Sequence, residues 1–323
     1  MTLPVGLVLG AAVAPRELVR TAQLGERLGF GELWFGEDCF YTGGVAGAAA
    51  ALASTERVPI GLGIVPAVVR HPALLAMEFA TLAQLFPGRF WPGIGLGVPA
   101  WMRQMRLMPK SPLTAMRECV GAVHALLAGE KLSDEGTYYG FRDVRLAHPP
   151  EEPIPVYMGV NGPKMLQLSG EVADATVVSV LAGPQYVTWA REQIAAGMAR
   201  AGRSGHHRVA VYTLFAVDRD GGRAREAIRG PMAFYLNAAG PTNALAQVAG
   251  IAEELAAGEV TAETLPAAWV DELAVAGDPE ECAAKIRQLL DAGADSVCLL
   301  PLPAERAEKI VELAAAEVLP RLV

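Results

Sequence analysis

The sequence lacks the residue patterns that mark a secreted, disulfide-bonded or metal-binding protein. Its four cysteines, Cys39, Cys119, Cys282 and Cys298, lie far apart and form no CxxC pair. Such spacing argues against a disulfide framework or a zinc knuckle, and it favours reduced thiols in a cytoplasmic protein. The five histidines are equally dispersed, with no HxH or HExxH cluster. We therefore expect no metal site.

Concentrated positive charge and long apolar runs are also missing. The formal net charge is −8 and the basic residues are scattered, so no nucleic-acid or membrane partner is expected. No run reaches the roughly 18 apolar residues of a membrane span. The apolar run near the N-terminus has no basic residues before it, which predicts a strand and not a signal peptide. There is no GxSxG motif or P-loop, and the GIGLGVP run at 93 lacks the spacing of a dinucleotide fingerprint.

What the chain does have is a regular alternation of apolar strands with one-sided helices. Near-continuous apolar strands are typical of a parallel sheet that is covered on both faces. With 323 residues, 52% of them hydrophobic, the pattern predicts a single (β/α)8 TIM barrel domain over residues 1–323. The eight expected strands are residues 4–9, 32–36, 59–64, 90–95, 154–158, 176–180, 209–217 and 296–300.

Two segments interrupt this alternation. Residues 131–148 predict a short hairpin insertion, and residues 230–277 predict an alanine-rich helical insertion before the last strand. The sequence Asp278-Pro279-Glu280-Glu281 that follows has the N-cap, proline and glutamate of a helix start. Cys282 is then expected to pack in the core.

Residues 153–180 have the pattern of a βαβ unit with a glycine-rich turn after its first strand. The turn reads Gly159-Val160-Asn161-Gly162, and Pro163-Lys164 opens the helix. Glycines let the backbone come close to a ligand, and the free N–H groups at a helix start attract anions. The turn is either a phosphate-binding site, helped by the Lys164 charge, or an ordinary connection between a strand and a helix.

In a (β/α)8 barrel the active site lies at the C-terminal ends of the strands. Glu37 and Asp38 follow the second strand and are candidates for acid–base work, although they could also solvate a loop or cap the next helix. After other strands come His71, a possible helix cap, and Arg70 and Arg103, possible surface ion-pair partners. Further residues expected at this end are Phe40, Tyr41, Val65, Gly95, Gly97, Trp101 and Ser179.

Four stretches resemble a known family. They are PIPVYMGVNGPKMLQLSGEVAD at 153, GLGIVPAVVRHP at 61, FPGRFWPGIGLG at 86 and VAGDPEECAAKI at 275. In these the chain resembles the luciferase-like flavin and deazaflavin oxidoreductases, with most likeness to the coenzyme F-420-dependent methylenetetrahydromethanopterin reductases. Weaker likeness covers almost the full length, and the GPKMLxLxGExAD string is the most specific part.

The resemblance implies a cofactor pocket at the strand ends, with F-420 as the cofactor and FMN as the alternative. It also implies a bulged third strand with a non-prolyl cis peptide at Gly63–Ile64 behind the ring, and a homodimer. The residues expected to bind the cofactor are Gly63, Ile64, Val65, Gly95, Gly97, Gly159, Val160, Asn161, Gly162, Pro163, Lys164 and Ser179.

One position departs from the family pattern. Relatives often carry Asp-His after the second strand, where this chain has Glu37-Asp38. A carboxyl donates a proton near neutral pH only if its pKa is raised, and of the two we expect Glu37 to act. The sequence thus predicts hydride transfer between reduced F-420 and a small organic substrate. The alternatives are an FMN-dependent monooxygenase served by a separate reductase, and a cofactor-binding protein without catalysis.

Overall fold

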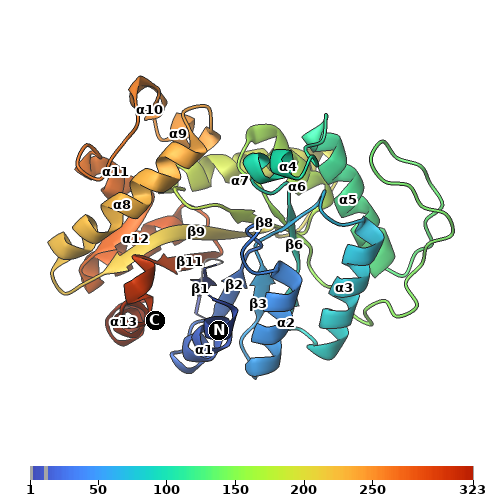
Figure 1. Cartoon of the computed structure of the whole chain (residues 1–323), viewed down its shortest axis with the longest axis horizontal. Coiled ribbons are helices and arrows are strands. Elements are labelled where there is room, and N and C mark those ends of the chain that lie inside the picture. Colours follow the sequence, from blue (N-terminus) through green and yellow to red (C-terminus); the bar gives the residue numbers. More distant parts are fainter. Residues whose placement is uncertain (1–2, 11–13, 323) are drawn as a thin grey trace.

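The computed structural model describes residues 3–10 and 14–322, and in it parallel strands form the centre of the molecule with helices around the outside (Figure 1). All eight strands expected from the sequence are present, the third and the fourth each as two segments. The bounds are β1 (Val5–Leu9), β2 (Glu32–Phe35), β3 (Ile60–Leu62), β4 (Val65–Pro66), β5 (Phe90–Trp91), β6 (Gly93–Gly95), β7 (Tyr157–Gly159), β8 (Ala175–Val178), β9 (Arg208–Val217) and β11 (Ser296–Pro301).

The pairing of these strands closes the sheet into a barrel. β1 pairs with β2 on one side and with β11 on the other, and β11 continues through β9, β8 and β7 to β6. β3 and β4 are two halves of the third strand, and β5 and β6 are two halves of the fourth. Because β3 pairs with β5 and β4 pairs with β6, the two strands lie side by side and complete the circle. The predicted (β/α)8 architecture is confirmed.

The third and fourth strands are each interrupted, where the sequence pattern predicts single strands. The third is broken by a cis peptide bond between Gly63 and Ile64, which is the bulge that the family resemblance implies. The fourth is broken at Pro92, which has no N–H to donate to a neighbouring strand. Its carbonyl is still used, since it accepts a hydrogen bond from the N–H of Tyr157 at 2.8 Å.

The helices pack their apolar faces against the barrel. Leu75, Phe79 and Leu82 of α3 are buried. The start of α12 has the predicted capping box between Asp278 and Glu281. The helices are α1 (Pro15–Arg27), α2 (Gly44–Ser54), α3 (Pro72–Leu85), α4 (Pro99–Gln104), α5 (Pro112–Leu127), α6 (Pro163–Val172), α7 (Pro184–Arg200), α8 (Gly221–Ala239), α9 (Ala244–Val248), α10 (Ala252–Ala257), α11 (Ala267–Leu273), α12 (Pro279–Asp291) and α13 (Ala307–Leu313), followed by the short turns η2 (Ala314–Val318) and η3 (Leu319–Arg321).

The insertion at 131–148 is a loop with two isolated antiparallel bridges instead of a regular hairpin. The bridges join Leu132 to Val144 and Glu135 to Gly140. The loop is held mainly by Glu118 of α5, whose carboxylate accepts the backbone N–H groups of residues 137–139 at 2.8, 2.8 and 3.3 Å. A side chain from another element therefore replaces most of the expected ladder.

The insertion expected at 230–277 has different bounds and a different end. α8 begins at Gly221 and runs through residue 230 to Ala239 without a break. Pro231 lies inside this helix and does not end it. The last four residues of the segment form strand β10 (Ala274–Gly277), which pairs with the C-terminal half of β9. The predicted helical insertion is present as α8 to α11, but its last four residues form a strand, since pairing with a distant strand outweighs the helical preference of a short alanine-rich stretch.

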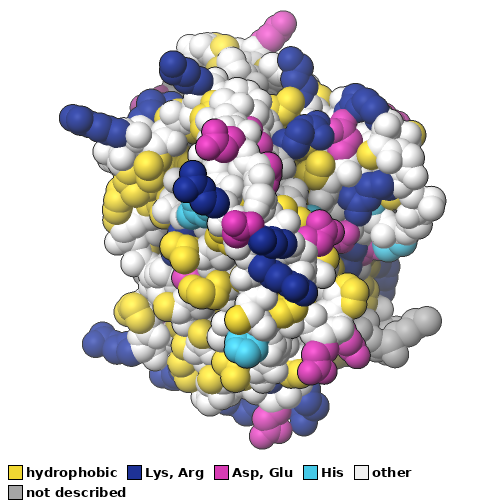
Figure 2. All heavy atoms as spheres, turned by 90° about the vertical axis from the view of Figure 1, so that its right-hand side faces the viewer, with side chains coloured by type: hydrophobic (Ala, Val, Ile, Leu, Met, Phe, Trp, Pro, Cys, Tyr) yellow, Lys and Arg dark blue, Asp and Glu magenta, His cyan; other side chains and the backbone are white. Residues whose placement is uncertain are grey.

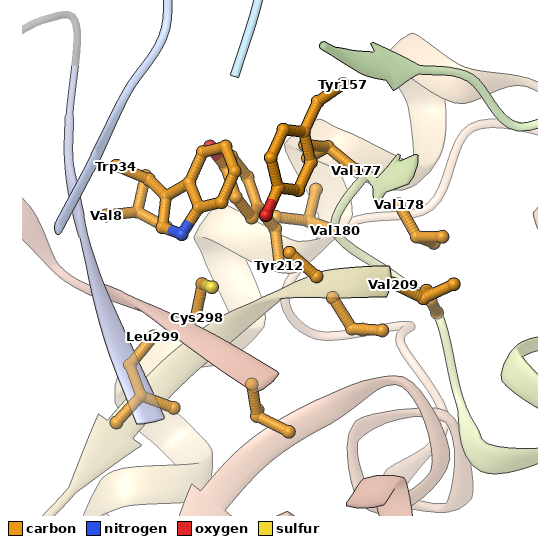
Figure 3. Close-up of a cluster of buried hydrophobic side chains, with 14 of the residues drawn as sticks. Val8, Trp34, Tyr157, Val177, Val178, Val180, Val209, Tyr212, Cys298 and Leu299 are labelled. Carbon is orange, nitrogen blue, oxygen red and sulfur yellow. The ribbon is translucent and has the colours of Figure 1, made fainter. Parts of the chain in front are cut away.

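The barrel interior below the strand ends holds a buried ion pair and a group of aromatic rings. Glu32 at the start of β2 pairs with Arg208 at the start of β9 and also accepts the Trp34 indole N–H at 2.9 Å. Figure 3 shows the rings of Trp34, Tyr157 and Tyr212 close together; the Trp34 ring lies 5.1 Å from that of Tyr157. These groups fill the barrel from below. In the described part of the chain, no helix has the length and hydropathy to cross a membrane.

Candidate active site

A cavity of about 360 Å³ opens at the C-terminal ends of the strands. This is the end of a (β/α)8 barrel at which active sites form. The walls come from strands on both sides of the cis peptide and from the helices above them. The lining residues are Gly36, Glu37, Asp38, Gly63, Ile64, Leu96, Gly97, Val98, Trp101, Met116, Gly159, Val160, Asn161, Met165, Val177, Ser179 and Tyr212.

Ile64 forms an aliphatic surface in this cavity because glycines make room for its side chain. An added Cβ at Gly95 would lie 2.7 Å from Cγ1 of Ile64, and one at Gly159 would lie 2.4 Å from Cγ2. A third glycine, Gly93, would place its Cβ 3.5 Å from the same Cγ2 atom. Glycines on two neighbouring strands therefore hold Ile64 against the barrel wall, beside Gly63.

The Glu37 carboxylate lines the cavity but is already engaged by other groups. Arg70 donates two hydrogen bonds to it, at 2.7 and 2.8 Å, and the N–H of Gly44 at the start of α2 donates a third at 2.7 Å. The Glu37 side chain is only 8% exposed. An arrangement in which both oxygens accept from a guanidinium is suited to a fixed negative charge. Glu37 therefore ties the loop after β2 to α2 and to Arg70, as the capping alternative from the sequence predicted.

The Asp38 carboxylate has different surroundings. It lies at the rim of the cavity, and within the described part of the chain it accepts no side-chain or backbone hydrogen bond. Desolvation by the surrounding wall raises the pKa of Asp38 above its ordinary value. The charge of Asp38 is also felt by Tyr235 of α8, whose pKa is raised first by burial and then by this carboxylate. Of the two neighbouring acids, Asp38 is the one with a carboxyl open to a ligand.

The glycine turn after β7 reaches the cavity with its first three residues. Gly159, Val160 and Asn161 line it, and the Asn161 amide oxygen accepts the N–H of Ser179 at 3.3 Å. α6 begins at Pro163 with Gly162 as its N-cap, as predicted. A helix start without a side-chain cap therefore follows the part of the turn that lines the cavity, and its role as a phosphate-binding site stays a prediction.

Not every residue expected at the cofactor site lines the cavity. Val65 and Gly95 are buried behind its surface, and Gly162 and Pro163 begin α6 just beyond it. The Lys164 side chain lines a separate hollow on the outside of the barrel, together with Arg117 and Arg200. Lys164 therefore does not line the cavity, although it belongs to the first turn of α6. Its expected contact with a phosphate stays a prediction.

Two of the aromatic residues expected at this end of the barrel do not line the cavity. Phe40 and Tyr41 are 69% and 64% exposed. Phe40 has a positive φ of 75°, which is uncommon for a residue with a side chain. Trp101 of α4 does line the cavity. His71 caps α3, since its Nδ1 accepts the N–H of Ala73 at 3.2 Å.

Tyr212 of β9 is a cavity residue that the sequence analysis missed. It lies in the middle of an apolar strand. The sequence feature that could have pointed to it is its hydroxyl group, because buried parallel strands are mostly aliphatic. Its phenol reaches the cavity floor beside Gly63. The register of β9 brings it there, and register cannot be obtained from a single strand.

The cavity lining contains two acids and no cation. Glu37 and Asp38 are its acidic residues, and none of the lining residues is a lysine, arginine or histidine. The Glu37 charge is paired with Arg70, which does not line the cavity. In the described residues there is also no group of three or more His, Cys, Asp or Glu side chains placed to hold a metal ion. The other lining residues are apolar or glycine, apart from Asn161, Ser179 and Tyr212.

Comparison with known proteins is consistent with this geometry. The family described as luciferase-like monooxygenase matches residues 3–296. A 5,10-methylenetetrahydromethanopterin reductase of Methanolobus tindarius is 30% identical over 315 residues, covering 94% of this chain and 95% of the relative. An F420-dependent glucose-6-phosphate dehydrogenase of Beutenbergia cavernae is 31% identical over 329 residues, covering 96% of this chain and 94% of the relative.

Solved structures have the same fold over the whole chain. The coenzyme F420-dependent tetrahydromethanopterin reductase from Methanopyrus kandleri matches with a TM-score of 0.85 and 27% identity, covering 100% of both chains. The oxygenating constituent of 3,6-diketocamphane monooxygenase from Pseudomonas putida, in complex with FMN, matches with a TM-score of 0.76 and 18% identity, covering 100% of this chain and 99% of that one. At that lower identity the second match shows the fold alone.

Proposed function

The chain belongs to the luciferase-like monooxygenase family, and we propose that it is an oxidoreductase that transfers a hydride between coenzyme F-420 and an uncharged organic substrate. Two relatives of about equal similarity support this proposal, an F420-dependent glucose-6-phosphate dehydrogenase and a 5,10-methylenetetrahydromethanopterin reductase. Both align with nearly the full chain. F-420, when bound, supplies or accepts the hydride. The protein's own residues hold the ring, exclude water and provide a proton.

The placement of Ile64 carries this proposal. Gly93, Gly95 and Gly159 let it lie against the wall, so that its side chain and the Gly63 backbone form a smooth support on one side of the cavity. Leu96, Trp101 and Met116 give the cavity apolar walls that limit water. A tricyclic ring supported in this way would keep one face open toward Asp38 at the rim.

We assign the proton-donating role to Asp38 and a structural role to Glu37. This reverses the order expected from the sequence, because the Glu37 carboxylate is held by Arg70 and by the start of α2. Asp38 has no such partner in the described residues, and its raised pKa keeps more of it protonated at a given pH. A protonated carboxyl at the rim can donate to a substrate oxygen or nitrogen that gains electrons.

The substrate class follows from the lack of a cation in the cavity lining. A phosphate or carboxylate on the substrate would find no lysine, arginine or histidine among the lining residues. The anion would lose its hydration without gaining a partner, which is unfavourable. The activity named for the glucose-6-phosphate dehydrogenase relative is therefore not proposed for this chain. A neutral, largely apolar molecule fits the walls better.

An FMN-dependent monooxygenase is the alternative, since the same cavity geometry supports a flavin ring and the FMN-bound neighbour has the same fold. Such an enzyme would need a separate reductase to supply reduced flavin. Oxygen consumption separates the two functions. The protein is mixed with reduced F-420 or reduced FMN, and with neutral carbonyl or enone compounds, and both cofactor absorbance and dissolved oxygen are followed. Our proposal expects oxidation of F-420 that requires the substrate and does not consume oxygen. Oxygen uptake with FMN, and none of this F-420 turnover, would contradict it.

We also propose that the protein is a homodimer that uses the outer face of α3. Leu74, Met77 and Leu85 of this helix are 54%, 51% and 65% exposed. Figure 2 looks at the side of the molecule on which α3 and α5 lie, and hydrophobic side chains gather there in several clusters among charged ones. The buried face of α3 covers the barrel, so the exposed residues remain available for a second copy.

A further inference from the structure

Tyr212 has a buried hydroxyl that no other group in the described part of the chain satisfies. The residue is 8% exposed, it lines the cavity, and its hydroxyl oxygen has no hydrogen-bond partner among these residues. Buried hydroxyl groups are almost always hydrogen-bonded, because leaving one unpaired is unfavourable. An unpaired hydroxyl on the floor of a candidate active site therefore needs a physical explanation.

The phenol is fixed in this position by its neighbours. Its ring lies 5.8 Å from the ring of Trp34 in an edge-on contact, and Trp34 is itself held by the hydrogen bond from its indole N–H to Glu32. Figure 3 shows the Tyr212 ring enclosed by Trp34 and Tyr157 inside the barrel. The ring cannot turn away to find another partner without disturbing this packing.

Gly63 is the residue that leaves room for the Tyr212 hydroxyl. A Cβ atom at position 63 would lie 1.9 Å from the Tyr212 hydroxyl oxygen. Any side chain there would displace the phenol. The Tyr212 hydroxyl therefore fills the space that a side chain at position 63 would take. This space lies beside Ile64, on which the ring is proposed to lie.

The hydroxyl can act as a donor at any physiological pH. Burial, followed by the nearby Cys298 and Glu32, raises the pKa of Tyr212 well above its ordinary value. The group therefore stays protonated and neutral. A neutral donor on a floor without cations selects a neutral acceptor such as a ring carbonyl.

We propose that the Tyr212 hydroxyl donates a hydrogen bond to a carbonyl oxygen at the innermost edge of the bound ring. This inference rests on the proposed function. Flavins and deazaflavins share a pyrimidinedione edge with such carbonyls, so Tyr212 is a positioning residue that sets how deep and in which orientation the ring enters.

The test compares Tyr212→Phe with the wild type in two measurements. The first is titration with F-420 and with FMN, which follows both the dissociation constant and the absorption maximum of the bound cofactor. Loss of one neutral hydrogen bond should weaken binding about three- to tenfold, and loss of a bond to the chromophore should shift the absorption maximum. Tyr139→Phe is the matched control, because the Tyr139 hydroxyl donates to the carbonyl of Ala67 at 2.9 Å and does not line the cavity.

The second measurement is thermal unfolding of the protein without cofactor. Removing an unsatisfied hydroxyl should leave the midpoint of Tyr212→Phe equal to or above that of the wild type, whereas Tyr139→Phe should lower it. Unchanged affinity and spectrum, or a lowered midpoint for Tyr212→Phe, would overturn the inference. If the wild type binds neither cofactor, the proposed function fails by itself, and a lowered midpoint of Tyr212→Phe would still overturn the assignment of an unpaired donor.

Discussion

At the scale of single residues, Glu37 and Asp38 show how far apart two adjacent carboxylates can be in role. Glu37 is nearly buried and bound by Arg70 and Gly44, whereas Asp38 is open to the cavity rim. The sequence predicted that the pair stands at the site. The sequence did not predict their different roles, because the contact between Glu37 and Arg70 joins residues that are far apart in the sequence and meet only in the folded chain.

We expect Asp38→Asn to lower turnover about 10²- to 10⁴-fold, as for the loss of a general acid. The pKa of Asp38 is raised, so the protonated form persists to a higher pH than in an ordinary aspartate. Turnover should therefore fall as pH rises through this pKa, and the variant should lack that fall. Rates measured across pH with saturating cofactor test this, and a variant with the wild-type rate and profile would contradict it.

Glu37→Gln is the matched comparison for this prediction. It removes the charge that pairs with Arg70 in a largely buried site, which should lower the free energy of unfolding by about 1.5–3 kcal/mol. Urea denaturation measures this loss. A Glu37→Gln protein of unchanged stability that lost the pH-dependent step would return the catalytic role to Glu37.

At the scale of elements, the strands and most helices could be predicted from apolar runs, prolines and caps. α6 begins and ends where its sequence indicates, and the start of α12 was readable from Asp278 to Glu281. β10 and the loop held by Glu118 could not be predicted, because both depend on contacts between residues far apart in sequence. The same limit explains why Tyr212 was missed.

The capping box of α12 gives a prediction of stability. The Asp278 carboxylate accepts the N–H groups of Glu280 and Glu281, both at 2.9 Å. Asp278→Ala should lower the free energy of unfolding by about 1 kcal/mol. Glu280→Ala is the control, since the Glu280 side chain is exposed in the same turn and takes no part in the box. Equal stability of the two variants in urea denaturation would show that the cap contributes nothing measurable.

Acid should weaken the same helix start. A hydrogen bond from Arg225 lowers the pKa of Glu281, with further help from the N–H of Asp278. A lowered pKa in the folded state means that the ionised group stabilises the fold above its ordinary pKa. This contribution is lost as pH falls through the lowered value. Glu281→Gln should therefore flatten the acid side of the stability profile, and an unchanged slope in pH-dependent urea denaturation would contradict this.

At the scale of the whole molecule, the proposed dimer can be separated from the barrel itself. Met77 is half exposed on the outer face of α3, so Met77→Glu should place a charge in the interface without disturbing the core. The wild type should have the mass of a dimer in light scattering at micromolar concentration, and Met77→Glu should shift toward the monomer. Phe234→Glu is the control, because Phe234 is an exposed hydrophobic residue on a different helix, α8. A monomeric wild type would refute the dimer.

The central claim is that the cavity at the strand ends binds coenzyme F-420 in preference to FMN. Fluorescence titration of the wild-type protein with each cofactor tests it most directly, because binding does not depend on knowing the substrate. We predict micromolar or tighter binding of F-420 with quenching of its fluorescence, and weaker binding of FMN. Stoichiometric copurification of FMN, with no quenching of F-420, would contradict the account and favour the flavin-dependent alternative.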